Sequence, residues 1–259
     1  MTTKRITRRG LLRAGMVAAL GGISYGAYRT LIAPNALRIL ESAEYATLKA
    51  QRLLLSGQPL AREFSPEQMS PTFRANGTTN PKSPGYQAMA ANNFTNWRLT
   101  IDGLVANPAS LSLADLEGFP QRTQITRHDC VEGWSAIGKW TGVPLALLLQ
   151  SAGISDHARF VVFHCADDYY PATDGSARYY ESIDLFDAFH PQTILAHRMN
   201  DAALPVAHGA PLRLRVERQL GYKHAKYLMR IEVTDNLSRI GMGKGGFWPD
   251  RGYEWYAGI

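Results

Sequence analysis

Short strand-like and short helix-like segments alternate along the chain in an irregular order, and this pattern restricts the possible folds most. Strands are indicated by alternating or continuous apolar residues, and helices by capping residues and flanking proline or glycine. The predicted strands are 97–101, 123–126, 160–165, 212–216 and 228–233, and the predicted helices are 112–117, 144–150 and 183–189. This order is too irregular for a doubly wound parallel sheet. We therefore predict a mixed α+β domain with its functional residues on loops.

The excess positive charge of the chain is confined to its N-terminal end. The formal net charge is +6, and six of the 28 basic residues precede residue 36, where no acidic residue occurs. The remaining 22 basic residues are balanced by 22 acidic residues. A nucleic-acid-binding protein needs a basic surface on its folded domain. We therefore exclude nucleic acid as a partner.

Residues 1–35 are typical of an export signal. Arg8 and Arg9 precede a modestly apolar run over 14–33, and segment 7–13 resembles the twin-arginine signal. That route carries folded proteins, which suits a protein that must acquire a complex cofactor before export. An ordinary secretory signal or an uncleaved anchor remains the alternative, because no Ala-x-Ala cleavage site precedes Pro34. We predict a periplasmic protein, anchored to the membrane if the leader stays uncleaved.

Residues 36–91 differ in composition from the rest of the chain. Residues 36–55 have helical composition and spacing, and five prolines and three glycines follow between residues 56 and 91. We predict a helix and then an irregular segment that wraps a domain formed by residues 92–259. Within that domain, residues 245–256 are rich in glycine and aromatic residues. Such a tail fits either a loop that covers a site or a packed terminus.

The two cysteines, Cys130 and Cys165, have several possible roles. A disulfide is the simplest arrangement in an oxidising compartment. A zinc site with His128 and His164 is disfavoured, because His164 and Cys165 are neighbours on a predicted strand and point to opposite faces. A nucleophilic cysteine with a histidine base lacks a characteristic neighbouring sequence here. A thiolate that holds a metal is the fourth possibility.

Three motifs follow one another in the chain and favour the fourth possibility. They are RHDCVEGW at 127–134, continued by WTGVPL at 140–145, then HGAPLR at 208–213 and GYKHAKY at 221–227. Together they resemble the molybdenum-binding segments of the sulfite oxidase family of molybdopterin-binding oxidoreductases. The similarity covers roughly residues 92–234 and is greatest to the bacterial branch that contains the periplasmic protein-methionine-sulfoxide reductase catalytic subunit. Three ordered motifs are far more specific than a lone cysteine.

The resemblance implies which residues hold the cofactor. In this family, molybdenum is bound by the dithiolene of one pyranopterin and by a cysteine thiolate, and Cys130 occupies the position of that ligand. Cys130 is therefore the implied metal ligand and catalytic residue. Arg213 and Lys226 match positions that contact the pterin, and a guanidinium suits its phosphate. The implied cofactor-binding residues are Asn92, Asn93, Cys165, His208, Arg213, His224, Ala225 and Lys226.

Some of these positions carry further implications. His224, Ala225 and Lys226 are implied to offer backbone amides to the cofactor. Cys165 and His208 stand where the reductase relative has threonine and asparagine. These two differences alter hydrogen bonding, and they bear on the substrate more than on the cofactor.

The implied activity is oxygen-atom transfer between a substrate and the metal, with reduction of an S-oxide or N-oxide as the expected direction. Oxidation of sulfite or a related sulfur oxyanion is the enzymatic alternative, and a non-catalytic binding module stapled by a disulfide is the second. The sequence contains no Cys-x-x-Cys-His haem attachment motif. Electrons are therefore expected to be exchanged with an external haem protein. The chain ends soon after the last motif, as expected of the compact single-domain branch.

Overall fold

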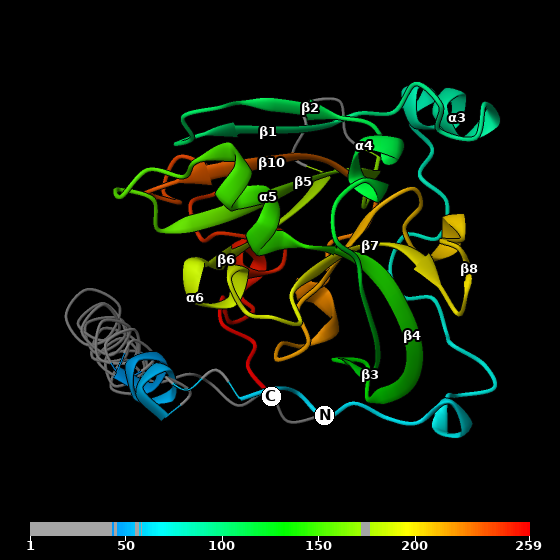
Figure 1. The fold of residues 1–259 in the computed structure, drawn as a ribbon. Coiled ribbons are helices and arrows are strands. Elements are labelled where there is room, and N and C mark those ends of the chain that lie inside the picture. The colour runs from blue at the N-terminus through cyan, green and yellow to red at the C-terminus, as the bar shows by residue number, and fades with distance from the viewer. Residues whose placement is uncertain (1–42, 44–45, 55–56, 58, 172–176) are drawn as a thin grey trace, which may run out of the picture. The chain divides into compact units, whose positions relative to one another are not determined.

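The computed structural model describes residues 43, 46–54, 57, 59–171 and 177–259 (Figure 1). The chain divides into two compact units, Met1–Pro59 and Leu60–Ile259. In the first unit, residues 46–54 are helical, which agrees with part of the helix predicted over 36–55. The predicted export signal lies outside the described residues. Within the described ranges, no helix combines the length and apolar character needed to span a membrane.

The first sheet of the second unit has five strands in the order β2-β1-β10-β5-β6. They are β1 (Leu99–Gly103), β2 (Ala109–Leu111), β5 (Phe160–Asp168), β6 (Arg178–Asp184) and β10 (Leu228–Thr234). β1 and β10 are parallel, and the other neighbouring pairs are antiparallel. The main hydrophobic core joins residues of this sheet to the buried face of α5 (Leu145–Ala152), which lies beside β5 in Figure 1.

The second sheet places Cys130 at the end of a strand. It contains β3 (Arg122–Cys130), β4 (Trp134–Pro144), β7 (Ile194–Met199), β8 (Ala202–Ala203) and β9 (Arg213–Arg215), with β9 paired to β7. β3 and the long β4 form an antiparallel hairpin in which Cys130 pairs with Trp134. Gly133 closes the turn by donating its N–H to the Cys130 carbonyl at 3.0 Å, and its φ of 85° favours glycine. Cys130 therefore sits at a tightly defined strand end.

Short helices and an irregular segment complete this unit. The helices are α3 (Pro84–Ala91), α4 (Leu113–Glu117) and α6 (Leu185–Ala188), with 3₁₀ turns η2 (Pro66–Gln68), η3 (Val206–His208), η4 (Gly221–Lys223) and η5 (Pro249–Arg251). Residues 59–83 contain only η2 and a bridge at Glu63, as expected of an irregular segment. The domain boundaries at residues 36 and 92 stay predictions.

The mixed α+β class is confirmed, and the predicted strands correspond to β1, β3, β5, β9 and β10. The helices predicted over 112–117 and 144–150 correspond to α4 and α5. The helix predicted over 183–189 is wrong at its start, because Ile183 belongs to β6. Asp184 begins the helix instead, since its side chain accepts a hydrogen bond from the Asp187 N–H at 3.0 Å.

β4 was not predicted, because its buried face carries small residues. The buried positions 136, 138, 140 and 142 are alanine, glycine, tryptophan and glycine, so they give no apolar alternation. Gly142 is required by the close approach of β7, since a Cβ atom there would lie 2.0 Å from the Leu195 carbonyl oxygen. Tertiary packing, which the local pattern does not record, therefore specifies this strand.

Candidate active site

Cys130 lines a cavity of about 190 Å³. Separate segments of the chain form it, namely Asn76, Gly77, Thr78, Cys130, Val131, Glu132, Asp167, Tyr169, Tyr179, Gly221, Tyr222, His224, Lys226, Trp248 and Tyr253. Cys130 is only 9% exposed, and this burial raises the pKa of its thiol. Because Cys130 lines the cavity, its sulfur can reach a group bound there. A positive charge beside the sulfur would favour the thiolate form.

Lys226 supplies a buried positive charge at the cavity wall. Its Nζ donates to the carbonyl oxygens of Asn76 at 2.7 Å and Ala207 at 3.2 Å, and also to that of Thr78. Burial lowers the pKa of Lys226 to about 7, and the nearby Arg213 adds to this effect. Two of these bonds hold the segment around Asn76 and Thr78 at the cavity wall, and the third ties Lys226 to η3 (Val206–His208).

Arg213 lies behind this wall and is 1% exposed. It donates to the His208 carbonyl at 2.9 Å and stacks over Trp140, with 4.9 Å between the guanidinium carbon and the ring centroid. Its Nε has no hydrogen-bond partner. Burial, with Arg215 nearby, lowers the pKa of Arg213 to about 9. A buried cation with an unused donor suits an anionic group better than a solvated surface.

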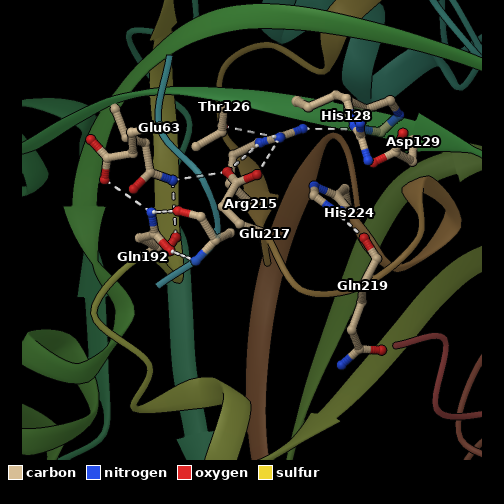
Figure 2. Close-up of polar contacts among 12 residues, drawn as sticks. Glu63, Thr126, His128, Asp129, Gln192, Arg215, Glu217, Gln219 and His224 are labelled. Carbon is tan, nitrogen blue, oxygen red and sulfur yellow. Dashed lines mark hydrogen bonds and ion pairs between the residues drawn. The ribbon is translucent and has the colours of Figure 1, made fainter. Parts of the chain in front are cut away.

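A chain of buried polar contacts fixes the ring of His128 (Figure 2). Arg215 forms an ion pair with Glu217 at 2.6 Å and donates from Nη1 to His128 Nδ1 at 3.0 Å. Because Nδ1 accepts, the proton of the neutral ring is on Nε2. Burial and the neighbouring Arg215 keep the pKa of His128 well below its ordinary value, so the ring stays neutral.

The same contacts continue from Glu217 to Gln192 and Glu63 (Figure 2). Gln124 donates to Glu217 at 2.8 Å and to the Gln192 carbonyl at 3.0 Å. Gln192 in turn donates to Glu63 at 2.9 Å. The network therefore joins the irregular segment over residues 59–83, through Glu63, to β3, which carries His128, and it restrains both.

Gly221 touches the fixed His128 ring, and this contact gives a testable prediction. A Cβ atom at residue 221 would lie 2.5 Å from His128 Nε2. Since His128 cannot retreat, Gly221→Ala is expected to displace η4, destabilise the fold by about 1–3 kcal/mol and lower the molybdenum content per chain. Elemental analysis and the unfolding temperature measure both effects. Gly85→Ala is the control, because no atom lies within 4 Å of its added Cβ; equal molybdenum content in the two variants contradicts the prediction.

The structure brings together five of the nine predicted site residues. Cys130, His224 and Lys226 line the cavity, and Arg213 contacts the His224 carbonyl at 3.5 Å. Ala225 is buried beside them. The amides of His224 and Ala225 donate to the carbonyls of Gly221 at 3.1 Å and Lys223 at 3.0 Å, so these two donors have partners within the turn.

The other four do not line the cavity. Asn92 is half-buried with an unpartnered Oδ1, and Asn93 is exposed with a φ of 53°. Cys165 is 3% exposed in the core of β5. His208 packs its ring against Phe73, and burial lowers its pKa to about 4.

Two of the alternatives for the cysteines, the disulfide and the zinc site, are not supported. Cys130 and Cys165 are both free thiols, so the disulfide is absent. In the described part of the chain, no group of three or more His, Cys, Asp or Glu side chains could hold a metal ion, so the zinc site is not formed.

Several cavity residues could not be recognised from the sequence. Asn76 and Thr78 come from the irregular segment, and Asp167 and Tyr169 follow the predicted strand 160–165. None belongs to a motif. Trp248 and Tyr253 belong to the glycine-rich and aromatic tail, for which a role as a covering loop was one of two predictions. Their place in the cavity wall supports that prediction.

The residues fit a molybdopterin. Its molybdenum accepts one soft sulfur ligand from the protein, which Cys130 offers, and its phosphate needs buried cations, which Lys226 and Arg213 offer. Its ring donors and acceptors need polar partners. Arg213 Nε, His224 Nδ1 and His128 Nε2 are buried without one.

Comparison with known proteins agrees with this fit. The family model described as "Oxidoreductase molybdopterin binding domain" matches residues 86–240. The chain is 36% identical over 255 residues to "Putative protein-methionine-sulfoxide reductase subunit YedZ1" of Azospira oryzae, covering 97% of this chain and 87% of that protein. It is 36% identical over 149 residues to the protein-methionine-sulfoxide reductase catalytic subunit MsrP of Campylobacter jejuni, covering 55% of this chain and 50% of MsrP.

Among solved structures, the sulfane dehydrogenase SoxCD from Paracoccus pantotrophus matches with a TM-score of 0.49 and 25% identity, covering 55% of this chain and 39% of that one. The family match spans more than half of the chain, and the Azospira relative is similar over nearly all of it. The chain therefore belongs to the oxidoreductase molybdopterin-binding domain family, that of the sulfite oxidases, and is a molybdopterin-dependent oxidoreductase.

Proposed function

We propose that the protein reduces an S-oxide, or an N-oxide of similar shape, by removing its oxygen atom. The observation that carries this proposal is the composition of the cavity around Cys130. Two carboxyl groups, Glu132 and Asp167, line it together with the cation of Lys226. Its other walls include the rings of Tyr169, Trp248 and Tyr253. A neutral sulfoxide with apolar substituents suits such a site, whereas the sulfite dianion would need a surplus of cations.

The relatives support the same direction of reaction. The Azospira and Campylobacter proteins both bear the name of protein-methionine-sulfoxide reductases. Methionine sulfoxide has a polar S–O group on a flexible, largely apolar side chain. We propose it, free or within a polypeptide, as the first substrate to test.

The chain's own residues would hold the cofactor and shape the site. Cys130 would ligate the molybdenum, and Arg213 and Lys226 would bind the pterin phosphate. When bound, the cofactor supplies two-electron chemistry and a metal that accepts an oxygen atom. The aromatic rings of Trp248 and Tyr253 would exclude water and orient the apolar part of the substrate.

Export and the electron partner also belong to this proposal. The leader over residues 1–35 would direct the folded protein to the periplasm by the twin-arginine route, and it would act as an anchor if uncleaved. A reduced haem protein of the membrane or periplasm would deliver electrons, because the sequence has no haem attachment motif of its own.

A comparison of two assays tests the function. Protein produced with its leader should contain about one molybdenum per chain and should reduce methionine sulfoxide with a reduced viologen dye as electron donor. The kcat/KM for this reaction should exceed that for sulfite oxidation with ferricyanide by more than about 100-fold, a difference of about 3 kcal/mol in transition-state stabilisation. A preference for sulfite, or molybdenum-loaded protein without S-oxide reduction, overturns the proposal.

A further inference from the structure

Asp167 is a buried carboxyl group at the cavity that no motif includes. It is 3% exposed, it lines the cavity with Cys130, and its Oδ1 has no hydrogen-bond partner. The register between β5 and β6 shifts between His164 and Asp168, so β5 is irregular where it reaches the cavity. Such irregularities redirect side chains beside active sites. Asp168 lies outside the cavity lining, partly exposed and paired with Arg178 at 3.0 Å.

The surroundings of Asp167 keep its carboxyl protonated up to a higher pH than in an ordinary aspartate. Burial raises the pKa of Asp167 to about 6, although a Thr78 hydrogen bond and the cations of Lys226 and Arg178 oppose this rise. The other titratable groups that interact with it are Cys165, Tyr86, Tyr169, Tyr179 and Tyr227. The pKa of each of these groups is raised, so they stay neutral and add no competing charge.

We propose that Asp167 is a further catalytic residue, a general acid that donates a proton to the oxygen atom released from the substrate. The inference rests on the proposed function. In sulfoxide reduction, the S–O bond breaks, the sulfur gains two electrons, and the oxygen leaves as water with two protons. A reduced haem protein supplies the electrons through the metal centre. Asp167 supplies one of the protons and is reprotonated from solvent, while the second comes from solvent directly.

The test compares Asp167→Asn with Asp168→Asn in the molybdenum-loaded enzyme. A positioned acid contributes about 10²–10⁴-fold to the rate, so Asp167→Asn is expected to lower kcat for methionine sulfoxide at least about 100-fold. In the wild type, kcat should fall as the pH rises above about 6, and this dependence should vanish in Asp167→Asn. Asp168→Asn, which removes the adjacent surface carboxyl, should keep the wild-type rate and pH profile. Asp167→Glu should restore part of the activity and its pH dependence.

A second measurement does not depend on turnover. Infrared difference spectra of resting enzyme, recorded between about pH 5 and about pH 8, should show a protonated carboxyl band that titrates near pH 6 and is missing in Asp167→Asn. Burial raises the pKa of Glu181 to about 7, so a second carboxyl band is expected that is present in both proteins. If Asp167→Asn has normal molybdenum content and a normal unfolding temperature but keeps more than half of the wild-type kcat, the inference is overturned. A band near pH 6 that is unchanged in Asp167→Asn also overturns it. Wild-type enzyme that reduces no S-oxide refutes the proposed function instead, whatever the infrared result.

Discussion

Cys130→Ser is expected to lower kcat for S-oxide reduction by more than about 100-fold, since changes in residues that only orient metal ligands already cost about 10–100-fold. Serine keeps the size of the side chain but replaces a soft sulfur donor with a hard oxygen. Cys130 is held at the end of β3 by its pairing with Trp134, so the backbone should not move. The pterin contacts proposed for Arg213 and Lys226 remain, and part of the cofactor should therefore stay bound.

X-ray absorption and electron paramagnetic resonance of the molybdenum measure the change at the metal. The Cys130→Ser spectrum should lose one sulfur neighbour. Cys165→Ala is the matched control, because this second thiol is buried in β5 and does not line the cavity. Its molybdenum spectrum should keep the wild-type set of sulfur neighbours. Loss of a sulfur neighbour in Cys165→Ala, or unchanged turnover in Cys130→Ser, contradicts the ligand assignment.

The position of Cys130 could be predicted because its motif is local. The strand predicted from residue 123, Cys130 and the turn at Gly133 follow one another closely in the sequence, so local residues specify their arrangement. The same holds for α4 and α5, whose caps are encoded beside them. Asp167 differs, because only the tertiary fold brings it to the cavity that Cys130 lines.

Arg213 and Arg215 illustrate why the burial and the long-range contacts of the site residues could not be predicted from the sequence. Their alternation with leucine is typical of a strand with one solvated face, yet both are buried. β9 pairs with β7, and Trp140 of β4 covers the two guanidinium groups. Likewise, the bond from Lys226 to the Asn76 carbonyl joins residues 150 positions apart. Contacts of this kind leave no periodic signal in the sequence.

The burial of Arg215 predicts a large stability effect. Its side chain and that of Glu217 are both 0% exposed, and they pair at 2.6 Å. Glu217→Gln should leave the guanidinium buried without its counter-charge, which typically costs about 3–5 kcal/mol. We expect about 3 kcal/mol, because the glutamine oxygen can still accept one hydrogen bond. For a domain of this size, the unfolding temperature should fall by about 6–12 °C.

β10 contains a matched control with the same Arg-x-Glu spacing. Arg230 and Glu232 pair at 3.0 Å, but their side chains are 38% and 25% exposed. Water screens this pair, so Glu232→Gln should cost less than about 1 kcal/mol. Differential scanning calorimetry of the two holoenzyme variants measures the difference. Equal unfolding temperatures would mean that water reaches Arg215 and that its ion pair with Glu217 does not fix His128.

The double variant Arg215→Met/Glu217→Leu separates stability from positioning. Replacing a buried ion pair with apolar side chains of similar volume is often neutral or stabilising, so the unfolding temperature should return to near that of the wild type. His128 would nevertheless lose the donor to its Nδ1, and its ring could turn beside Gly221. We therefore expect lower molybdenum content in a stable protein. Full molybdenum content in that variant would show that the pair serves the fold alone.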